Sequence, residues 1–386
     1  MAKGVYVGVD GVARKSRNAY VGVDNVARKI KKAYVGIGGV ARPCWNDGVT
    51  HYGEITPLSV ARSDIRTATL GDTIFFIGGE TYAGSYTPVV DVYNEDLTKT
   101  TTEMSIQRGK HACGTISNNV IIGGGRTANN GNTAIVESFD SDLVRTILTN
   151  FTYARRNLAC AFNERYVLFA GGTSGSLHNT VDAYNEQLTR VNANTISQQR
   201  SHLSGGTVGV YAMIAGGIYK SNSNSYNSII ADVFDTELTR TKATNLSTGR
   251  HSCDSCTIGN KVLFGGGALT NTSGSEVGVS AVVDTYDTTL TKGVAPELSY
   301  ARQTVGASFG STGAFVGGAN IDSKSVQTPC GQIDVYDSEL TLKSNLVLTT
   351  PRRSHGAAGT KRHILVGGGI YTDVLNPLTS VEALII

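Results

Sequence analysis

The sequence has no apolar run long enough to cross a membrane as a helix, and its first residues, "MAKGVYVGVDG", lack the apolar core of a secretion signal. No segment shows the 3.6-residue apolar period of an amphipathic helix. The 386 residues include 46 glycines and many Ser, Thr and Asn, a composition that suits tight turns. We therefore expect an all-β protein with no membrane insertion and no signal peptide.

One sequence unit occurs seven times: an Arg followed, sixteen residues later, by a Gly that ends a short apolar run such as "KVLFGGG". An acid two residues before an aromatic completes the unit, as in "VVDVYNEDLT", although the last copy, "SVEALII", has Leu384 in the aromatic position. Repeats of this length indicate a solenoid, a propeller or an array. The repeated arginines are Arg62, Arg108, Arg155, Arg200, Arg250, Arg302 and Arg352. The matching glycines are Gly78, Gly124, Gly171, Gly216, Gly266, Gly318 and Gly368.

Each unit predicts four short strands: A after the Arg, B ending at the glycines, C around the acid and aromatic, and D leading to the next Arg. Four strands per repeat is typical of a propeller blade. The Arg, the glycine pair and the acid-x-aromatic strand resemble the kelch repeat, and the resemblance, over about residues 47–386, implies a seven-bladed kelch-type β-propeller. The chain departs from that family in having no tryptophan after the aromatic, since its single one is Trp45.

The two ends of the repeat region predict how the ring closes. The seventh unit stops at strand C, whereas a segment resembling strand D, "GVTHYGEITPLSVAR", precedes the first unit. If this N-terminal strand completes the last blade, main-chain hydrogen bonds close the ring and no sheet edge stays open. We therefore predict a propeller domain of residues 47–386 after a separate segment of residues 1–46.

The N-terminal segment has its own repeat, of period fourteen, beginning "YVGVDGVARKSRNA". The dipeptides Asp10-Gly11, Asp24-Asn25 and Gly38-Gly39 lie between β-prone runs and favour two-residue hairpin turns, which predicts a small β-meander. Residues 1–43 carry a net charge of +7 and the rest of the chain −4. Such a segment buries little apolar surface, so we expect it to attach to a partner or to copies of itself.

This basic β-hairpin segment resembles the "YVGVGG-x-AR-K-x-KK" arrays of structural proteins of phages and prophages of Gram-positive bacteria. The resemblance implies a virion protein that is made in the host cytoplasm, reaches the exterior by lysis and binds another virion protein through this segment. A basic run can also bind nucleic acid or a membrane surface. The regular turn spacing argues against a disordered tail of that kind, so nucleic acid is the less favoured partner.

A ligand is expected on the face of the ring that carries the D–A and B–C loops. The B–C loops, such as "ETYAGSYTP" and "IYKSNSNSYNS", are the variable part of the repeat, and variable loops on a rigid frame often bind ligands. Tyrosines can stack on sugar rings while Asn and Ser hydrogen-bond to them. The candidate tyrosines are Tyr82, Tyr86, Tyr219, Tyr226 and Tyr371.

The seven repeated arginines lie on the same face and are also candidate ligand-binding residues. In animal kelch domains the matching Arg binds acidic peptides, so the resemblance implies an anion site. A structural role is the favoured alternative, because the same face holds an equal number of strand-C acids that can form ion pairs with the arginines. These acids are Asp91, Glu137, Asp182, Asp232, Asp284, Asp334 and Glu382.

The cysteines and glycine triplets do not indicate a metal, redox or phosphate site. Cys253 and Cys256, three apart on one strand, point to opposite faces, and no Cys or His pair matches them. Cys113 and Cys160 occupy a position where other copies carry small residues, so we expect small apolar side chains at the crowded axis. Glycines that bind phosphate precede a helix, which is absent here. No cofactor is predicted.

Four histidines lie near the expected channel mouth and can approach one another there: His111, His202, His251 and His355. Local hydrogen bonding is the favoured explanation for them, ahead of a metal cluster. We therefore expect a non-enzymatic phage or prophage tail adhesin whose loops bind a host-surface glycan or protein. One alternative is a kelch-type carbohydrate-active enzyme, such as a sugar epimerase or oxidase. Another is an intracellular kelch scaffold that binds an acidic peptide through the arginines.

Overall fold

The computed structural model describes the backbone of residues 6–9, 12–15, 20–23, 26–29, 32–37, 40–46, 49–128, 131–372 and 376–385. Side chains are described from residue 49 to 385, apart from residues 83, 129–130, 344–345 and 373–375. The chain divides into two compact units. One consists of Met1–Tyr52 together with Leu384–Ile386, and the other consists of Gly53–Ala383. In the part of the chain that is described, no helix is long and apolar enough to span a membrane.

The strands of the N-terminal segment form antiparallel hairpins. Val9 pairs with Val12 and Val23 with Val26, so two residues separate the paired strands, as predicted. The predicted turn dipeptides themselves lie outside the described residues. Among the described residues, each hairpin is a two-stranded sheet of its own, so these strands do not form the single sheet of the predicted β-meander. The strands are β1 (Tyr6–Val9), β2 (Val12–Lys15), β3 (Tyr20–Val23), β4 (Val26–Lys29), β5 (Lys32–Ile37) and β6 (Val40–Asn46).

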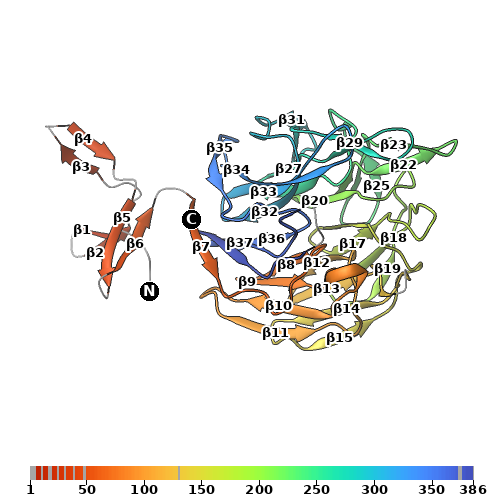
Figure 1. Cartoon of the computed structure of the whole chain (residues 1–386), viewed down its shortest axis with the longest axis horizontal. Helices are drawn as coiled ribbons and strands as arrows, with labels where there is room; N and C mark the ends of the chain where they lie inside the picture. Colours follow the sequence, from red (N-terminus) through yellow and green to blue (C-terminus); the bar gives the residue numbers. More distant parts are fainter. Residues whose placement is uncertain are drawn as a thin grey trace. The chain divides into compact units, whose positions relative to one another are not determined.

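The described strands from β7 to β38 form seven four-stranded antiparallel sheets arranged around an axis, which confirms the predicted seven-bladed propeller (Figure 1). Blade 1 consists of β8 (Arg66–Leu70), β9 (Thr73–Ile77), β10 (Val89–Tyr93) and β11 (Lys99–Glu103). Blade 2 consists of β12 (Ala112–Ile116), β13 (Asn119–Gly123), β14 (Val136–Asp140) and β15 (Arg145–Leu148). Blade 3 consists of β16 (Ala159–Phe162), β17 (Tyr166–Ala170), β18 (Val181–Asn185) and β19 (Arg190–Asn192). Blade 4 consists of β20 (Ser204–Val208), β21 (Tyr211–Ala215), β24 (Ala231–Phe234) and β25 (Arg240–Lys242). Blade 5 consists of β26 (Asp254–Ile258), β27 (Lys261–Gly265), β30 (Val283–Asp287) and β31 (Lys292–Val294). Blade 6 consists of β32 (Gln303–Phe309), β33 (Thr312–Ile321), β34 (Gln327–Tyr336) and β35 (Leu342–Val347).

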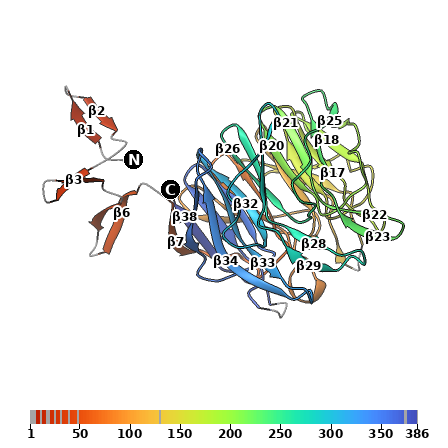
Figure 2. The same ribbon diagram turned by 90° about the horizontal axis from the view of Figure 1, so that it is seen from above.

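Blade 7 combines both ends of the repeat region, as the sequence predicted. It consists of β36 (Gly356–Gly359), β37 (His363–Gly367), β38 (Val381–Ile385) and, as its outer strand, β7 (Thr50–Ile55). Figure 2 shows β7 and β38 side by side. The N-terminal strand therefore supplies the pairing partner that the last strand C would otherwise lack.

The glycine pair at the end of strand B joins each blade to the next. The N–H of the second glycine donates to the carbonyl oxygen of the following blade's repeated Arg, as from Gly217 to Arg250 at 2.9 Å. The first glycine has a left-handed backbone, and a Cβ on Gly216 would lie only 2.6 Å from the same carbonyl oxygen. A side chain is excluded there by both the conformation and the close approach. The recurring glycines are thus a contact between blades.

Blade 6 departs from the spacing that the other six blades share. The residue that precedes the first glycine, Val316, pairs with Val305, only three residues after Arg302. The first glycine is therefore Gly317, and Gly318 is the second, because the Gly318 N–H donates to the Arg352 carbonyl. Matching Gly318 by count to the first glycines was wrong, since the pairing of strand A with strand B in this blade is shifted one residue closer to the Arg.

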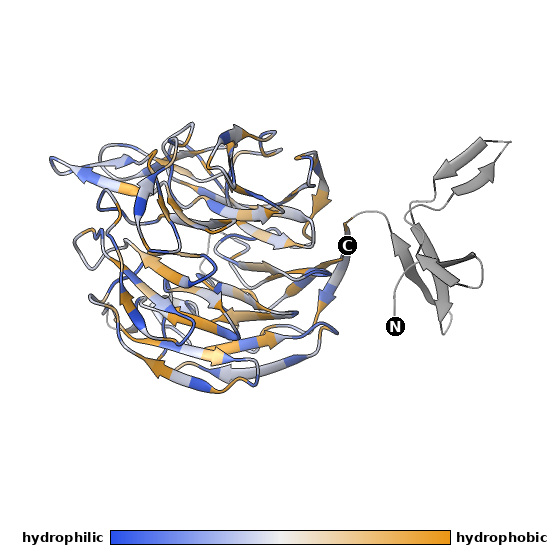
Figure 3. Cartoon of the chain, turned by 180° about the vertical axis from the view of Figure 1, so that it is seen from behind, coloured by the Kyte–Doolittle hydropathy of each residue, from blue (hydrophilic) through white to orange (hydrophobic). Residues whose placement is uncertain are grey.

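Apolar side chains of the strands pack between neighbouring blades to form the core. Phe75 and Ile77 of blade 1, for example, pack with Val120 and Ile122 of blade 2. Figure 3 shows apolar and polar segments alternating along the blades. The aromatic of strand C belongs to this core and also fixes the preceding loop, since the Tyr93 hydroxyl donates to the Thr56 carbonyl at 2.8 Å.

Candidate functional site

Each repeated Arg forms an ion pair with the strand-C acid of its own blade. The Arg62–Asp91 pair is 2.8 Å long, and the exposure of the seven arginines is 0%. The pairs are Arg62–Asp91, Arg108–Glu137, Arg155–Asp182, Arg200–Asp232, Arg250–Asp284, Arg302–Asp334 and Arg352–Glu382. The geometry matches the structural interpretation of these residues.

Further donors surround each acid. In every blade the backbone N–H of the residue three positions before the Arg donates a hydrogen bond to the strand-C acid, as from Ser59 to Asp91 at 3.0 Å. Burial by itself would raise the pKa of Asp91, but the charge of Arg62 and the hydrogen bonds from Ser59 outweigh burial and lower it. Ion pairs of this kind need such additional hydrogen bonds to offset the cost of desolvation.

The arginines also satisfy backbone carbonyls at the end of strand B. Arg155 Nη2 donates to Phe169 at 3.0 Å and Arg250 Nη2 to Phe264 at 3.0 Å. Because these guanidinium groups have no exposed surface, they present no edge to solvent in this structure. They hold each blade together at the face where the predicted loops meet.

The candidate tyrosines have three different environments. Tyr82 and Tyr371 are 71% and 50% exposed, whereas Tyr86 is buried. Tyr219 and Tyr226 are opposite each other in an additional hairpin of the blade 4 B–C loop, and their rings stack at 5.4 Å between centroids. The structure thus brings Tyr219 and Tyr226 together and leaves Tyr86 without surface for a ligand.

The B–C loops of blades 4, 5 and 6 are hairpins, which the sequence analysis did not predict. They are β22 (Ile218–Ser221) with β23 (Asn224–Asn227), β28 (Ala268–Thr270) with β29 (Glu276–Val279), and the outer halves of β33 and β34. We call them the hairpin wall. Figure 2 shows them along one edge of the ring. The short helix η1 (Tyr82–Gly84) lies in the corresponding loop of blade 1.

Hydrogen bonds connect the three hairpins. The Ser225 N–H donates to the Thr272 carbonyl at 2.9 Å, which joins blade 4 to blade 5. Gln327 Nε2 donates to Glu276 Oε2 at 2.8 Å, which joins blade 6 to blade 5. These hydrogen bonds make the wall one continuous surface.

A central channel of about 700 Å³ is lined by strand A of all seven blades. Its wall is crowded as predicted, since a Cβ on Gly205 would lie 1.8 Å from the Cys160 carbonyl oxygen. Small side chains bridge adjacent strands here: Thr67 Oγ1 donates to Ala357 at 2.6 Å and Cys113 Sγ to Thr67 at 3.2 Å. Burial raises the pKa of Cys113 to about 12, so its thiol stays protonated at neutral pH.

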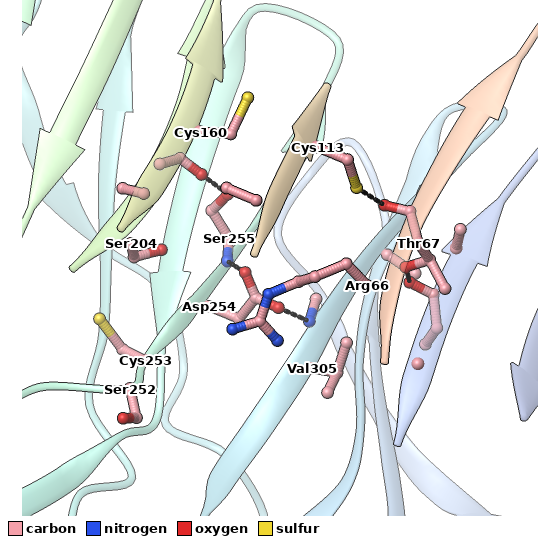
Figure 4. Close-up of a pocket in the computed structure, with 18 of the residues that line it drawn as sticks. Arg66, Thr67, Cys113, Cys160, Ser204, Ser252, Cys253, Asp254, Ser255 and Val305 are labelled. Atoms are coloured by element: carbon pink, nitrogen blue, oxygen red, sulfur yellow. Dashed lines mark hydrogen bonds between the residues drawn. The ribbon is translucent and has the colours of Figure 1, made fainter. Parts of the chain in front are cut away.

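Two charged residues of the channel, Arg66 and Asp254, were missed by the sequence analysis. Both are the first residue of a strand A, and Figure 4 shows both side chains in the channel. Asp254 accepts hydrogen bonds from the N–H groups of Ser255 at 2.8 Å and Gly306 at 3.0 Å. Burial raises the pKa of Asp254, against the opposing effects of these bonds and of Arg66.

Of the four candidate histidines, the structure brings His202 and His251 together. The rings of His202 and His251 are 5.9 Å apart, and His251 Nε2 lies 2.8 Å from the Thr270 hydroxyl. His111 and His355 are buried apart from them, and the ring nitrogens of His111 have no hydrogen-bond partner among the residues that the structure describes. Burial lowers the pKa of His355 to about 3.

Cys253 and Cys256 face different blades, as predicted. The Cys253 sulfur lies 3.6 Å from the Cβ position of Gly216 in blade 4, and the Cys256 sulfur 2.6 Å from that of Gly313 in blade 6. Among the residues described, no group of three His, Cys, Asp or Glu side chains is placed to hold a metal ion.

Comparison with known proteins identifies the fold and nothing finer. No family model matches the sequence, and no curated protein matches it. Among solved structures, the one described as "Structure of YjhT" is similar over 76% of this chain and 99% of that chain, with a TM-score of 0.57 and 11% sequence identity. At this identity the similarity shows a shared propeller architecture.

Proposed function

We propose that this protein is a non-enzymatic adhesin of a phage or prophage particle, with a kelch-type propeller whose hairpin wall binds a glycan or protein on the host surface. The observation that carries the proposal is the hairpin wall itself. Three variable loops are built as paired strands and cross-linked by hydrogen bonds. A pre-ordered surface of this kind loses little conformational entropy when it binds.

The wall has the chemistry of a carbohydrate-binding surface. The stacked rings of Tyr219 and Tyr226 are partly exposed and are flanked by the exposed polar residues Lys220 and Asn224. Aromatic rings offer rigid apolar area for the faces of sugars, while neighbouring amides and hydroxyls hydrogen-bond to their edges. The exposed Tyr82 and Tyr371 extend the same chemistry to the B–C loops of blades 1 and 7.

The basic β-hairpin segment has the role of attachment in this proposal. Its charge of +7 opposes the −4 of the remaining chain, so the two parts suit different partners. Mass spectrometry and electron microscopy of purified particles from the source strain test this part. We expect the protein in the particles, and its consistent absence from them would exclude a virion role.

Glycan binding by the full chain tests the role of the wall. We expect array binding that falls at least about tenfold in Tyr219→Ala and Tyr226→Ala, the equivalent of roughly 1.4 kcal/mol. Tyr211→Ala is the matched control, because Tyr211 begins strand B of the same blade at the opposite end. Equal losses in all three variants, or binding unaffected by the wall variants, would contradict this assignment.

A further inference from the structure

One position of strand A differs between blades in a way that the repeat does not require. This position pairs with the residue before the first glycine and, in six blades, lies four residues after the Arg. Its occupants, from blade 1 to blade 7, are Arg66, Ala112, Ala159, Ser204, Asp254, Val305 and Gly356. The blade architecture accepts a small or apolar residue here, so the two opposite charges need another explanation.

Arg66 is held away from a direct ion pair with Asp254. Its Nε donates to the His111 carbonyl at 3.0 Å and its Nη1 to the Ile65 carbonyl at 3.4 Å. Asp254 is held by the two backbone N–H groups of blades 5 and 6. The positive charge of Arg66 acts on Asp254 through space and favours a lower pKa for its carboxyl group. The fold thus fixes a cation and an anion that face the same cavity from blades 1 and 5 (Figure 4).

Both groups keep capacity for a ligand. The two hydrogen bonds of Arg66 use Nε and Nη1, and an ionised carboxylate such as Asp254 can accept about four hydrogen bonds. Ser204, at the same position of blade 4, is buried, and within the described part of the chain its hydroxyl has no hydrogen-bond partner. Buried polar groups without partners are uncommon in folded proteins, which favours a ligand that supplies them.

The other charged residues that line the channel precede strand A in the sequence and therefore lie nearer the channel mouth. Lys110, two residues after its repeated Arg, forms ion pairs with Asp64 at 3.5 Å and Glu80 at 3.8 Å. Arg353 follows its repeated Arg directly, outside strand A. At the depth of Arg66 and Asp254, one positive and one negative charge therefore define the electrostatics.

We propose that the central channel binds a small zwitterion of the amino-acid class, with its carboxylate at Arg66 and its ammonium group at Asp254. Two separated, opposite charges are complementary to a ligand that carries both charges. A guanidinium group binds carboxylates through paired hydrogen bonds, and a carboxylate accepts those of an ammonium group. The channel volume of about 700 Å³ lies within the usual range of small-molecule sites, roughly 300–1,000 Å³.

Isothermal titration calorimetry of the full chain with each of the standard L-amino acids tests the proposal. We expect saturable binding of at least one of them, weakened at least about tenfold by Arg66→Ala and by Asp254→Asn. Arg66→Lys, which keeps the charge, should weaken binding less than Arg66→Ala. Arg165→Ala is the control, because Arg165 is 53% exposed and paired with Glu237 outside the channel. Circular dichroism verifies that each variant is folded.

Derivatives of the amino acid that binds separate the zwitterion from other ligands. Its N-acetyl form lacks the ammonium group and its amide lacks the carboxylate, and we expect both to bind at least about tenfold more weakly. No binding of any amino acid up to about 10 mM, unchanged binding in folded Arg66 and Asp254 variants, or equal binding of the derivatives would overturn the proposal. Tyr219 lies in the hairpin wall and does not line the channel, so Tyr219→Ala should leave amino-acid binding unchanged. The test of the channel and the test of the adhesin function can therefore fail independently of each other.

Discussion

The backbone N–H of Gly369 donates to the carbonyl oxygen of Arg62 at 2.9 Å, so the last blade is joined to the first by the same contact that joins every other neighbouring pair. The repeated Arg therefore has two structural roles at once. Its carbonyl oxygen accepts a hydrogen bond from the second glycine of the preceding blade, and its guanidinium group forms an ion pair with the acid of its own blade. The stability of the ring depends on both contacts.

Gly216→Ala is expected to destabilise the propeller more than Gly259→Ala. Both glycines have a left-handed backbone, with φ of 66° and 55°, which costs an L-residue about 1–2 kcal/mol. Only at Gly216 does the new Cβ meet the Arg250 carbonyl oxygen, at 2.6 Å, while nothing lies within 4 Å at Gly259. Thermal unfolding followed by circular dichroism measures the difference. Equal midpoints for the two variants would show that the inter-blade contact is not tight.

Arg155→Met is expected to destabilise the fold by about 3 kcal/mol, because it leaves the buried Asp182 with only the partly exposed Arg190, 3.4 Å away, as a counter-charge. Arg165→Met, which breaks an exposed pair with Glu237, is expected to change stability by at most about 1 kcal/mol. Chemical denaturation of both variants and the parent chain gives the comparison. A small effect of Arg155→Met would mean that Arg155 is not required to hold the blade.

Removal of β7 is expected to open the ring. A chain that begins at residue 57 lacks this strand and exposes the edge of β38, so we expect a lower unfolding midpoint and self-association. A chain that begins at residue 47 keeps β7 and is expected to unfold at the temperature of the full chain. Size-exclusion chromatography and thermal unfolding measure both effects. Similar behaviour of the two truncated chains would refute a closing role for β7.

The stability of the propeller is expected to fall below about pH 6.5, partly because of His355. Burial depresses the pKa of His355 to about 3, so the unfolded chain binds a proton below pH 6.5 that the folded chain does not. The folded state therefore loses up to about 1.4 kcal/mol per pH unit from this group as the pH falls from 6.5 towards 3.

His355→Leu should remove that contribution and flatten the pH dependence. Leucine is a suitable replacement because Leu158 and Leu203 occupy the corresponding position, three residues after the Arg, in blades 3 and 4. Unfolding midpoints measured between pH 8 and pH 5 test this, with the unaltered chain as reference. A variant that is as sensitive to acid as the parent would assign the effect to other groups.

Much of the ring could be predicted because the repeated features are local and have local causes. The glycine pair marks the end of strand B, where a left-handed backbone meets a carbonyl, and the acid-x-aromatic strand marks the blade core. Counting residues failed only in blade 6, where strand pairing and not spacing identifies Gly317 as the first glycine. Register depends on partners in other strands, which a count along one chain does not contain.

The candidate sites were less predictable than the blades. Arginines and acids in equal number allowed either an anion site or ion pairs, and the sequence alone does not show that the arginines are buried and paired with the acids. Arg66 and Asp254 were overlooked because they do not recur, although comparing the same position across the seven blades would have revealed them as its only charged residues.

The sequence by itself determined the all-β class, the number of blades and the strand that closes the ring, because each of these follows from short-range patterns repeated along the chain. The tertiary structure alone decided that the repeated arginines are buried, that three loops form one hairpin wall, and that Arg66 and Asp254 face the same channel. These facts depend on which residues of different blades meet when the ring closes. The burial of the repeated arginines and the placement of Arg66 and Asp254 in one channel therefore follow from the closed ring and cannot be derived from local sequence.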